Sequence, residues 1–201
     1  MERLMCWTPL VILAVFLCHL QTSTACSCIY RHPQTKFCES DYVALVTIEE
    51  FATSNETRDT ASYKVHVNET FKATPAAQTA LEEKPVRLWT RSNSGLCGLI
   101  GLSPGETWVV GGGMSGGKMR ISSCGLAMPW SNVTPRQREN FRQFYQDGCA
   151  CQISYRYNES ADNKPCYIWE RPKEESNCQE RYDICMLGSA GCSWTPCTKT
   201  A

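Results

Sequence analysis

Cysteine is the residue that most constrains what this chain can fold into. The chain has 201 residues and fourteen cysteines, of which Cys6 and Cys18 fall in an apolar leader. The twelve others form an even, dense set, which in a secreted chain predicts up to six disulfides. Structural zinc is the alternative, but beyond the leader the chain has only His32 and His66, and its Cys-x-Cys pairs lack zinc-finger spacing. We therefore expect disulfides, and no cofactor of the chain's own.

The first 25 residues are typical of a secretory signal peptide. A short charged start precedes an apolar run from Pro9 to Cys18, which is shorter than the about 20 residues that span a bilayer. Ser23 and Ala25 place small side chains at the −3 and −1 positions of a cleavage site. We expect a protein secreted to the extracellular space or matrix, with no membrane span and with Cys26 as its first residue. An uncleaved membrane anchor is the alternative.

The charge balance and the glycosylation sequons indicate which partners and which modification to expect. Twenty Lys and Arg residues balance twenty Asp and Glu residues. Nothing in this balance suggests the basic face of a nucleic-acid-binding protein, and we expect no nucleic-acid partner. Four Asn-x-Ser/Thr sequons fit a secreted glycoprotein, and we expect glycan at one or two of them. The candidate asparagines are Asn55, Asn68, Asn132 and Asn158.

Five short segments have the alternating or β-branched pattern of strands. They are Tyr42–Ile48, Tyr63–Val67, Val86–Trp89, Trp108–Val110 and Met119–Ile121. With little helix between them, they predict a mainly β fold built on a small closed barrel, which leaves no strand edge unpaired. Residues 111–117 are rich in glycine and predict a turn between the last two strands. The start of a phosphate-binding loop is disfavoured there, because Met119 stands where that loop needs Ser or Thr.

One helix is marked by its start and its end. Thr134 can cap it, Pro135 suits its first position, and Gln137 completes a capping box with Thr134. Gly148 suits a left-handed exit. Aromatic side chains lie between these ends at helical spacing and are best explained as core packing: Phe141, Phe144 and Tyr145.

The composition changes after Cys149. Half of the twelve cysteines, six, lie in the last 51 residues, from Cys151 to Cys197. A segment so short relies on cross-links more than on an apolar core. The sequence therefore predicts a signal peptide at 1–25, a barrel domain at 26–149 and a small disulfide-stapled domain at 150–201.

Cleavage after Ala25 would give the chain a rigid first residue. Cys26 would open the triplet Cys26-Ser27-Cys28, and two disulfides within three residues would hold a terminus that otherwise frays. A terminal amine has a pKa of about 7.7–8.0, so a neutral fraction exists near pH 7. With the carbonyl oxygen of the same residue, that amine can chelate zinc. Because a catalytic zinc keeps one position open for water, such a chelator would displace the attacking water.

The triplet and the residues that follow it resemble the opening of the tissue inhibitors of metalloproteinases. The shared residues are Cys26-Ser27-Cys28, His32-Pro33-Gln34, Phe37-Cys38, Asp41, Cys97-Gly98, the run from Gly117 to Cys124, Pro129-Trp130, Gly148-Cys149 and Cys151. The resemblance covers residues 26–151. It implies a netrin-like, five-stranded OB-type barrel with flanking helices, followed by a small disulfide-rich C-terminal domain.

The resemblance also implies a disulfide pattern. In the barrel it implies Cys26–Cys97, Cys28–Cys124 and Cys38–Cys149. The C-terminal cysteines depart from the family, because a cysteine shortly after Cys151 is missing and Cys197 is additional. There we expect Cys151–Cys192, Cys166–Cys197 and Cys178–Cys185.

The resemblance assigns roles to two segments that together form the inhibitory ridge. Cys26 would chelate the zinc of the target protease, and Ser27 would enter the specificity pocket. The full ridge is Cys26, Ser27, Cys28, Ile29, Tyr30, Ser94, Gly95, Leu96 and Cys97. Tyr30 stands where the family usually has Pro, and Leu45 where it usually has Arg. The motif His32-Pro33-Gln34 is expected to shape the fold rather than to touch the target.

The implied partners are matrix metalloproteinases, with related metalloproteinases and the extracellular matrix as further candidates, and we expect a monomer. Two other hypotheses stay open. One is a netrin-like matrix or partner-binding module without inhibitory activity, which a residue before Cys26 in the mature protein would favour. The other is a thiol–disulfide oxidoreductase using Cys26 and Cys28 or Cys149 and Cys151, although neither pair has Cys-x-x-Cys spacing. We expect a protease inhibitor, not an enzyme.

Overall fold

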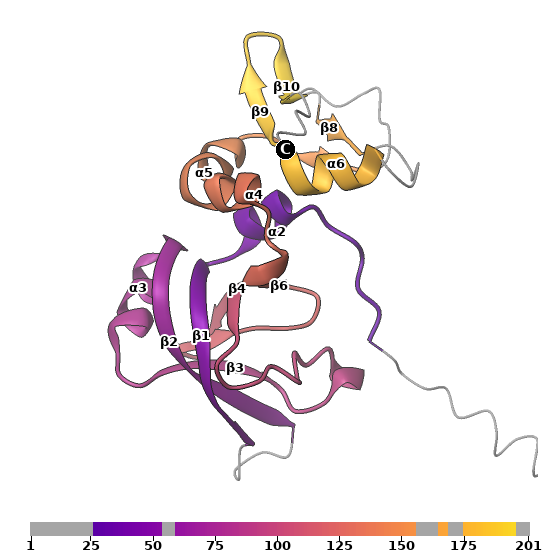
Figure 1. The fold of residues 1–201 in the computed structure, drawn as a ribbon. Coiled ribbons are helices and arrows are strands. Elements are labelled where there is room, and N and C mark those ends of the chain that lie inside the picture. The colour runs from indigo at the N-terminus through magenta and orange to yellow at the C-terminus, as the bar shows by residue number, and fades with distance from the viewer. Residues whose placement is uncertain (1–25, 54–58, 156–164, 169–174, 196–201) are drawn as a thin grey trace, which may run out of the picture.

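A computed structural model of the chain describes residues 26–53, 59–155, 165–168 and 175–195. Figure 1 shows a β-barrel at one end and small C-terminal sheets at the other, with three short helices, α2, α4 and α5, between them. The helices are α2 (Pro33–Glu39), α3 (Pro75–Glu82), α4 (Pro135–Glu139), α5 (Tyr145–Gly148) and α6 (Glu175–Tyr182). In the described ranges, no helix combines the length and apolar character needed to cross a membrane.

Five strands close into a barrel. In order around it they are β1 (Tyr42–Thr53), β2 (Thr60–Ala73), β3 (Val86–Arg91), β5 (Lys118–Arg120) and β4 (Thr107–Ser115), and β4 pairs back onto β1. A further strand, β6 (Leu126–Pro129), pairs with β4. Every pairing in this sheet is antiparallel except β3 with β5. The predicted mainly β, five-stranded barrel is confirmed, and of the predicted strand residues only Ile121 falls just outside its strand.

The glycine-rich stretch is a turn only at its end. Gly116 and Gly117 have φ of 57° and 72° and form the turn between β4 and β5. The first three glycines, 111–113, lie within β4, so the predicted turn is wrong there. A Cβ on Gly112 would lie 1.9 Å from the carbonyl oxygen of Arg120. Gly112 therefore allows the close approach of neighbouring backbone and does not reverse the chain.

The first part of strand β1, from Tyr42 to Ile48, is buried on both sides. Its residues alternate, so that Ala44 and Val46 face the barrel interior while Val43 and Leu45 face the helices. The outer core combines aromatic and aliphatic side chains from distant parts of the chain, including Phe37, Phe141, Tyr145 and Ile184. Leu45, where the family usually has Arg, is 7% exposed in this apolar layer. Its burial gives a packing reason for an apolar residue at that position.

The predicted helix begins as expected. The Oγ1 of Thr134 accepts a hydrogen bond from the Gln137 backbone N–H at 3.1 Å, and the Gln137 Oε1 accepts one from the Thr134 N–H at 3.0 Å. After α4 the helix widens into a π-helical segment, η3 (Asn140–Phe144), before it continues as α5. Phe141 and Tyr145 are buried as predicted, and Phe144 packs partly buried against the same core.

The predicted left-handed exit at Gly148 is wrong. Gly148 lies in α5 with an ordinary negative φ, and so does the following Cys149, at −67°. Glycine is required for another reason, because a Cβ at this position would lie 2.5 Å from the Nε2 of Gln34. The missing side chain makes room for an interior hydrogen bond.

The C-terminal part consists of two small sheets and α6. The strands β7 (Ile153–Ser154) and β8 (Cys166–Tyr167) are parallel, and β9 (Cys185–Gly188) and β10 (Gly191–Trp194) form an antiparallel hairpin. A short 3₁₀ turn, η1 (Ser94–Leu96), precedes β4, and another, η2 (Trp130–Asn132), follows β6.

The disulfides agree with expectation in the barrel and at Cys151–Cys192, and differ at the other cysteines of the C-terminal part. The structure contains Cys26–Cys97, Cys28–Cys124, Cys38–Cys149 and Cys151–Cys192. Cys166 is paired with Cys185 across 5.9 Å between Cα atoms, so the predicted Cys166–Cys197 and Cys178–Cys185 bridges are wrong. The reason is that β8 and β9 pack into one small cluster, which buries both sulfurs. Cys178 is disulfide-bonded, and Cys197 lies outside the described residues.

Gln34 on α2 joins the barrel to the C-terminal part. Its side chain is 1% exposed. The Nε2 donates to the carbonyl oxygens of Gly148 and Cys185, both at 2.8 Å, and the Oε1 accepts from the Cys185 backbone N–H at 2.9 Å. One amide thus satisfies three buried backbone groups on α5 and β9.

His32 lies in the same joint and caps α2. Its Nδ1 accepts from the Gln34 backbone N–H at 3.1 Å, so the proton resides on Nε2, which donates to the Gln179 carbonyl oxygen at 3.0 Å. The ring also lies 5.2 Å from that of Trp194, between centroids. Burial lowers the pKa of His32 to about 4. Both motif side chains are therefore interior, as a structural role requires.

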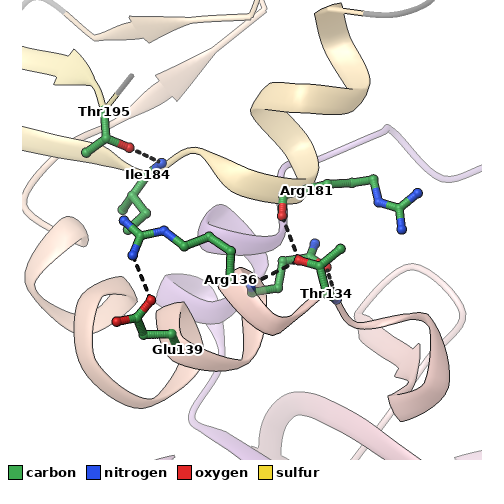
Figure 2. A network of polar contacts seen from close by, with 7 residues as sticks. Thr134, Arg136, Glu139, Arg181, Ile184 and Thr195 are labelled. Carbon is green, nitrogen blue, oxygen red and sulfur yellow. Dashed lines mark hydrogen bonds and ion pairs between the residues drawn. The ribbon is translucent and has the colours of Figure 1, made fainter. Parts of the chain in front are cut away.

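A second polar contact connects α4 to α6, and Figure 2 shows it from close by. The Thr134 hydroxyl donates to the carbonyl oxygen of Arg181 at 2.9 Å. Nearby, Arg136 forms an ion pair with Glu139 at 2.7 Å, and the Ile184 N–H donates to the Thr195 hydroxyl at 3.0 Å. The cap of α4 therefore also holds the C-terminal part.

Replacing Gln34 by alanine should destabilise the protein. The variant Gln34→Ala leaves the buried N–H and carbonyl of Cys185 without a partner and removes one of the two hydrogen bonds on the Gly148 carbonyl. The free energy of unfolding should therefore fall by roughly 3 kcal/mol. Urea denaturation with intact disulfides measures this. The matched control is Gln78→Ala on α3, whose exposed side chain bonds to Glu82 in the same helix. It should change the free energy of unfolding by less than about 0.5 kcal/mol. Equal losses in the two variants would contradict the assignment.

His32 should make stability depend on pH. Because its pKa is lowered from 6.5 to about 4 in the folded protein, the unfolded chain binds the proton first. Stability from this group is complete above pH 6.5 and falls by up to roughly 3 kcal/mol as the pH drops toward 4. The variant His32→Asn can keep the cap without titrating.

The measurement is the difference between the two unfolding curves over this pH range. The difference matters because burial also raises the pKa of Asp183 to about 6, so that carboxyl titrates in both proteins. Curves that stay parallel from pH 7 to pH 4 would contradict a buried neutral His32.

Candidate functional site

The N-terminal segment is fixed to two loops by disulfides. Cys26 is bridged to Cys97 and Cys28 to Cys124, with Cα atoms 5.0 and 5.2 Å apart. The bridges lie side by side, because the Cys26 and Cys124 sulfurs are 3.6 Å apart. Residues 26–28 are therefore held at two points within one extended stretch.

The loop that receives Cys26 is itself tightly built. The Oδ1 of Asn93 accepts the Leu96 N–H at 2.9 Å and caps η1. Cys97 then adopts φ 59°, and its carbonyl oxygen accepts the Ser123 N–H at 3.0 Å. A Cβ on Gly98 would lie 2.2 Å from the Arg91 carbonyl oxygen. These contacts fix the position at which Cys97 meets Cys26.

The structure brings the two predicted ridge segments together at the surface. Seven of the nine ridge residues are exposed, and only the bridged pair Cys26 and Cys97 is partly buried. Three of the exposed ridge side chains are large and apolar: Ile29 is 78% exposed, and Tyr30 and Leu96 are each 47% exposed. Exposed apolar side chains on a rigid support are typical of a surface that binds another protein.

The sulfurs of this site are not available as thiolates. In the described part of the chain, the groups of three potential metal ligands are Cys26, Cys28 and Cys124, and Cys151, Cys185 and Cys192. All six sulfurs are in disulfides. Cys26 and Cys28 are bonded to different partners, and so are Cys149 and Cys151. Neither pair is therefore the mutual disulfide that a dithiol oxidoreductase uses.

One contact at the ridge was not expected from the sequence. The ring of Tyr30 meets that of Tyr155 edge-on, with centroids 5.8 Å apart. No local pattern connects residues so distant in the chain. The one sequence feature that singles out this position is that Tyr30 stands where the family usually has Pro.

Two of the candidate sequons lie on the described surface. Asn68, on β2, is exposed, and its Nδ2 donates to the Thr47 hydroxyl at 2.9 Å. Asn132 is exposed at the end of η2. Asn55 and Asn158 lie outside the described residues.

Comparison with known proteins identifies relatives over most of the chain. A family model described as Tissue inhibitor of metalloproteinase matches residues 24–194. Tissue inhibitor of metalloproteinase from Drosophila melanogaster is 29% identical over 181 residues, which cover 88% of this chain and 81% of that protein. Metalloproteinase inhibitor 2 from Homo sapiens is 27% identical over 196 residues, covering 87% and 83%. Metalloproteinase inhibitor 4 from Mus musculus is 28% identical over 179 residues, covering 85% and 80%.

The family match includes both segments of the ridge and all five bridges among the described residues. The chain belongs to the tissue inhibitor of metalloproteinase family.

Proposed function

We propose that this chain is a secreted inhibitor of zinc metalloproteinases that acts through the first residue of its mature form. The observation that carries the proposal is the double clamp on residues 26–28, which supports an exposed apolar ridge. Removal of the signal peptide after Ala25 would create an α-amine on the clamped Cys26. That amine and the Cys26 carbonyl oxygen would bind the protease zinc as a chelate.

Rigidity is what makes such a chelate effective. A flexible terminus would lose conformational freedom on binding, whereas a terminus already fixed by Cys97 and Cys124 loses little. The Cys26–Cys97 bridge closes a sequence separation of 71 residues, so it ties the terminus to the body of the barrel rather than to a local loop. Displacing the zinc-bound water would remove the nucleophile of the protease.

The remaining ridge would determine which proteases bind. Ser27 follows the chelating residue directly and is exposed, so its side chain would enter the specificity pocket. Ile29, Tyr30 and Leu96 would fill the cleft on either side. Matrix metalloproteinases are the proposed partners, with related metalloproteinases and the extracellular matrix as further candidates, for a monomeric protein that carries no zinc of its own.

An added N-terminal residue should abolish inhibition. One alanine placed before Cys26 in the mature protein moves the α-amine away from the zinc, and the inhibition constant should rise at least about a hundredfold, or about 2.7 kcal/mol. The measurement is titration of a matrix metalloproteinase catalytic domain that cleaves a fluorogenic peptide. The matched control carries one alanine after Ala201. Mass determination first checks that the natural form begins at Cys26.

The outcomes of this titration separate the hypotheses. Equal inhibition by the extended and natural forms would contradict the chelate. If the natural form inhibits no member of a broad metalloproteinase panel, the barrel is a binding module instead.

A charge on Ser27 should weaken inhibition by a different route. The variant Ser27→Asp would bury an unpaired carboxylate in the specificity pocket, so the inhibition constant should rise at least about tenfold. The control Ser131→Asp places the same charge on an exposed serine in η2 and should leave inhibition unchanged. An unaffected Ser27→Asp variant would mean that this side chain stays outside the pocket.

A further inference from the structure

The segment between Cys28 and His32 is a short bridge with fixed ends. Its first end is the Cys28–Cys124 disulfide, and its second is the buried His32. A groove lies on each side of this segment. A groove of about 510 Å³ lies between the segment and the glycines of β4, and another of about 500 Å³ separates it from Cys149, Cys151 and Tyr155.

Tyr30 reaches across the second groove. Its ring meets the Tyr155 ring at an interplanar angle of 79°, the edge-to-face geometry that aromatic pairs prefer. Because 47% of Tyr30 remains exposed, the same side chain can touch Tyr155 and still present a face to a partner.

Tyr155 is well supported on its own side. It packs against the small cluster that contains Ile153, Cys166 and Cys185. The Cys151–Cys192 bridge lies just before β7, and β7 ends immediately before Tyr155. Tyr155 is therefore a fixed point of the C-terminal part.

From these contacts we infer that the C-terminal part braces the inhibitory ridge, with Tyr155 as the residue that positions Tyr30. This inference rests on the proposed function, because it concerns the residues that would meet the protease. Tyr155 does not itself need to contact the protease. Tyr30 provides the ring that the family's usual proline lacks, so this support depends on the departure at that position.

The test is a double-mutant cycle on inhibition by the full mature chain. The variant Tyr155→Ala should raise the inhibition constant about two- to tenfold, the range of an aromatic pair. In a Tyr30→Ala background the same substitution should have no further effect. Tyr155→Phe keeps the ring and should inhibit like the wild type. The control Leu187→Ala alters a 62% exposed side chain of β9 and should change nothing.

Two results would overturn the inference while the proposed function stands. One is a Tyr155→Ala protein that inhibits as well as wild type. The other is an equal loss with and without Tyr30, which would mean that Tyr155 contacts the protease directly. If Tyr155→Ala does not fold, Tyr155→Leu removes the ring and keeps the apolar volume.

A second measurement needs no protease. Backbone ¹⁵N order parameters of Ile29, Tyr30 and Arg31 should be lower in Tyr155→Ala than in wild type, and unchanged in Tyr155→Phe. Unchanged order parameters in Tyr155→Ala would overturn the brace even if the wild-type protein inhibited nothing. Lower order parameters in a protein that inhibits no protease would support the brace and contradict the proposed function alone.

Discussion

The side-chain amide of Gln34 is the interaction on which the arrangement of this molecule depends. It satisfies the carbonyl of Gly148 and both backbone groups of Cys185 inside the protein. A side chain at position 148 would displace the amide of Gln34, and Cys185 is at the same time bonded to Cys166. A buried amide is costly when its partners are missing, so these hydrogen bonds favour the observed arrangement of α2, α5 and β9.

That position has a consequence for the ridge. The strand that leads to Tyr155 belongs to the part that Gln34 holds, and Tyr30 lies four residues before Gln34 in the sequence. The same short stretch therefore begins at the disulfide-clamped Cys26 and ends in the joint. Disulfides fix its first half and buried hydrogen bonds fix its second half, and the chain between them has little freedom left.

Disulfides and buried hydrogen bonds constrain this chain in different ways. A disulfide limits the unfolded chain and holds two backbone points together, but it leaves exposed side chains such as Ile29 free to contact a partner. The joint around His32 and Gln34 is buried and polar, so it fixes geometry and responds to pH. A rigid ridge with exposed side chains requires the former, and a defined contact between barrel and C-terminal part requires the latter.

Local patterns in the sequence determined a large share of this protein. Alternation identified the five barrel strands, and the capping box at Thr134 located the start of α4, because both depend on residues close in the chain. The dense cysteines indicated an oxidised, cross-linked fold. The resemblance carried by Cys26-Ser27-Cys28 pointed to the ridge, although its role in zinc binding stays a proposal.

Tertiary structure decided what depends on distant atoms. The pairing of Cys166 with Cys185 follows from how β8 and β9 pack, which cysteine spacing does not encode. Gly148 looked like a helix terminator, and its true requirement is space for Gln34. The contact of Tyr30 with Tyr155 likewise joins residues far apart in the chain. In each case the deciding quantity is a distance between residues far apart in the chain, which no local sequence pattern contains.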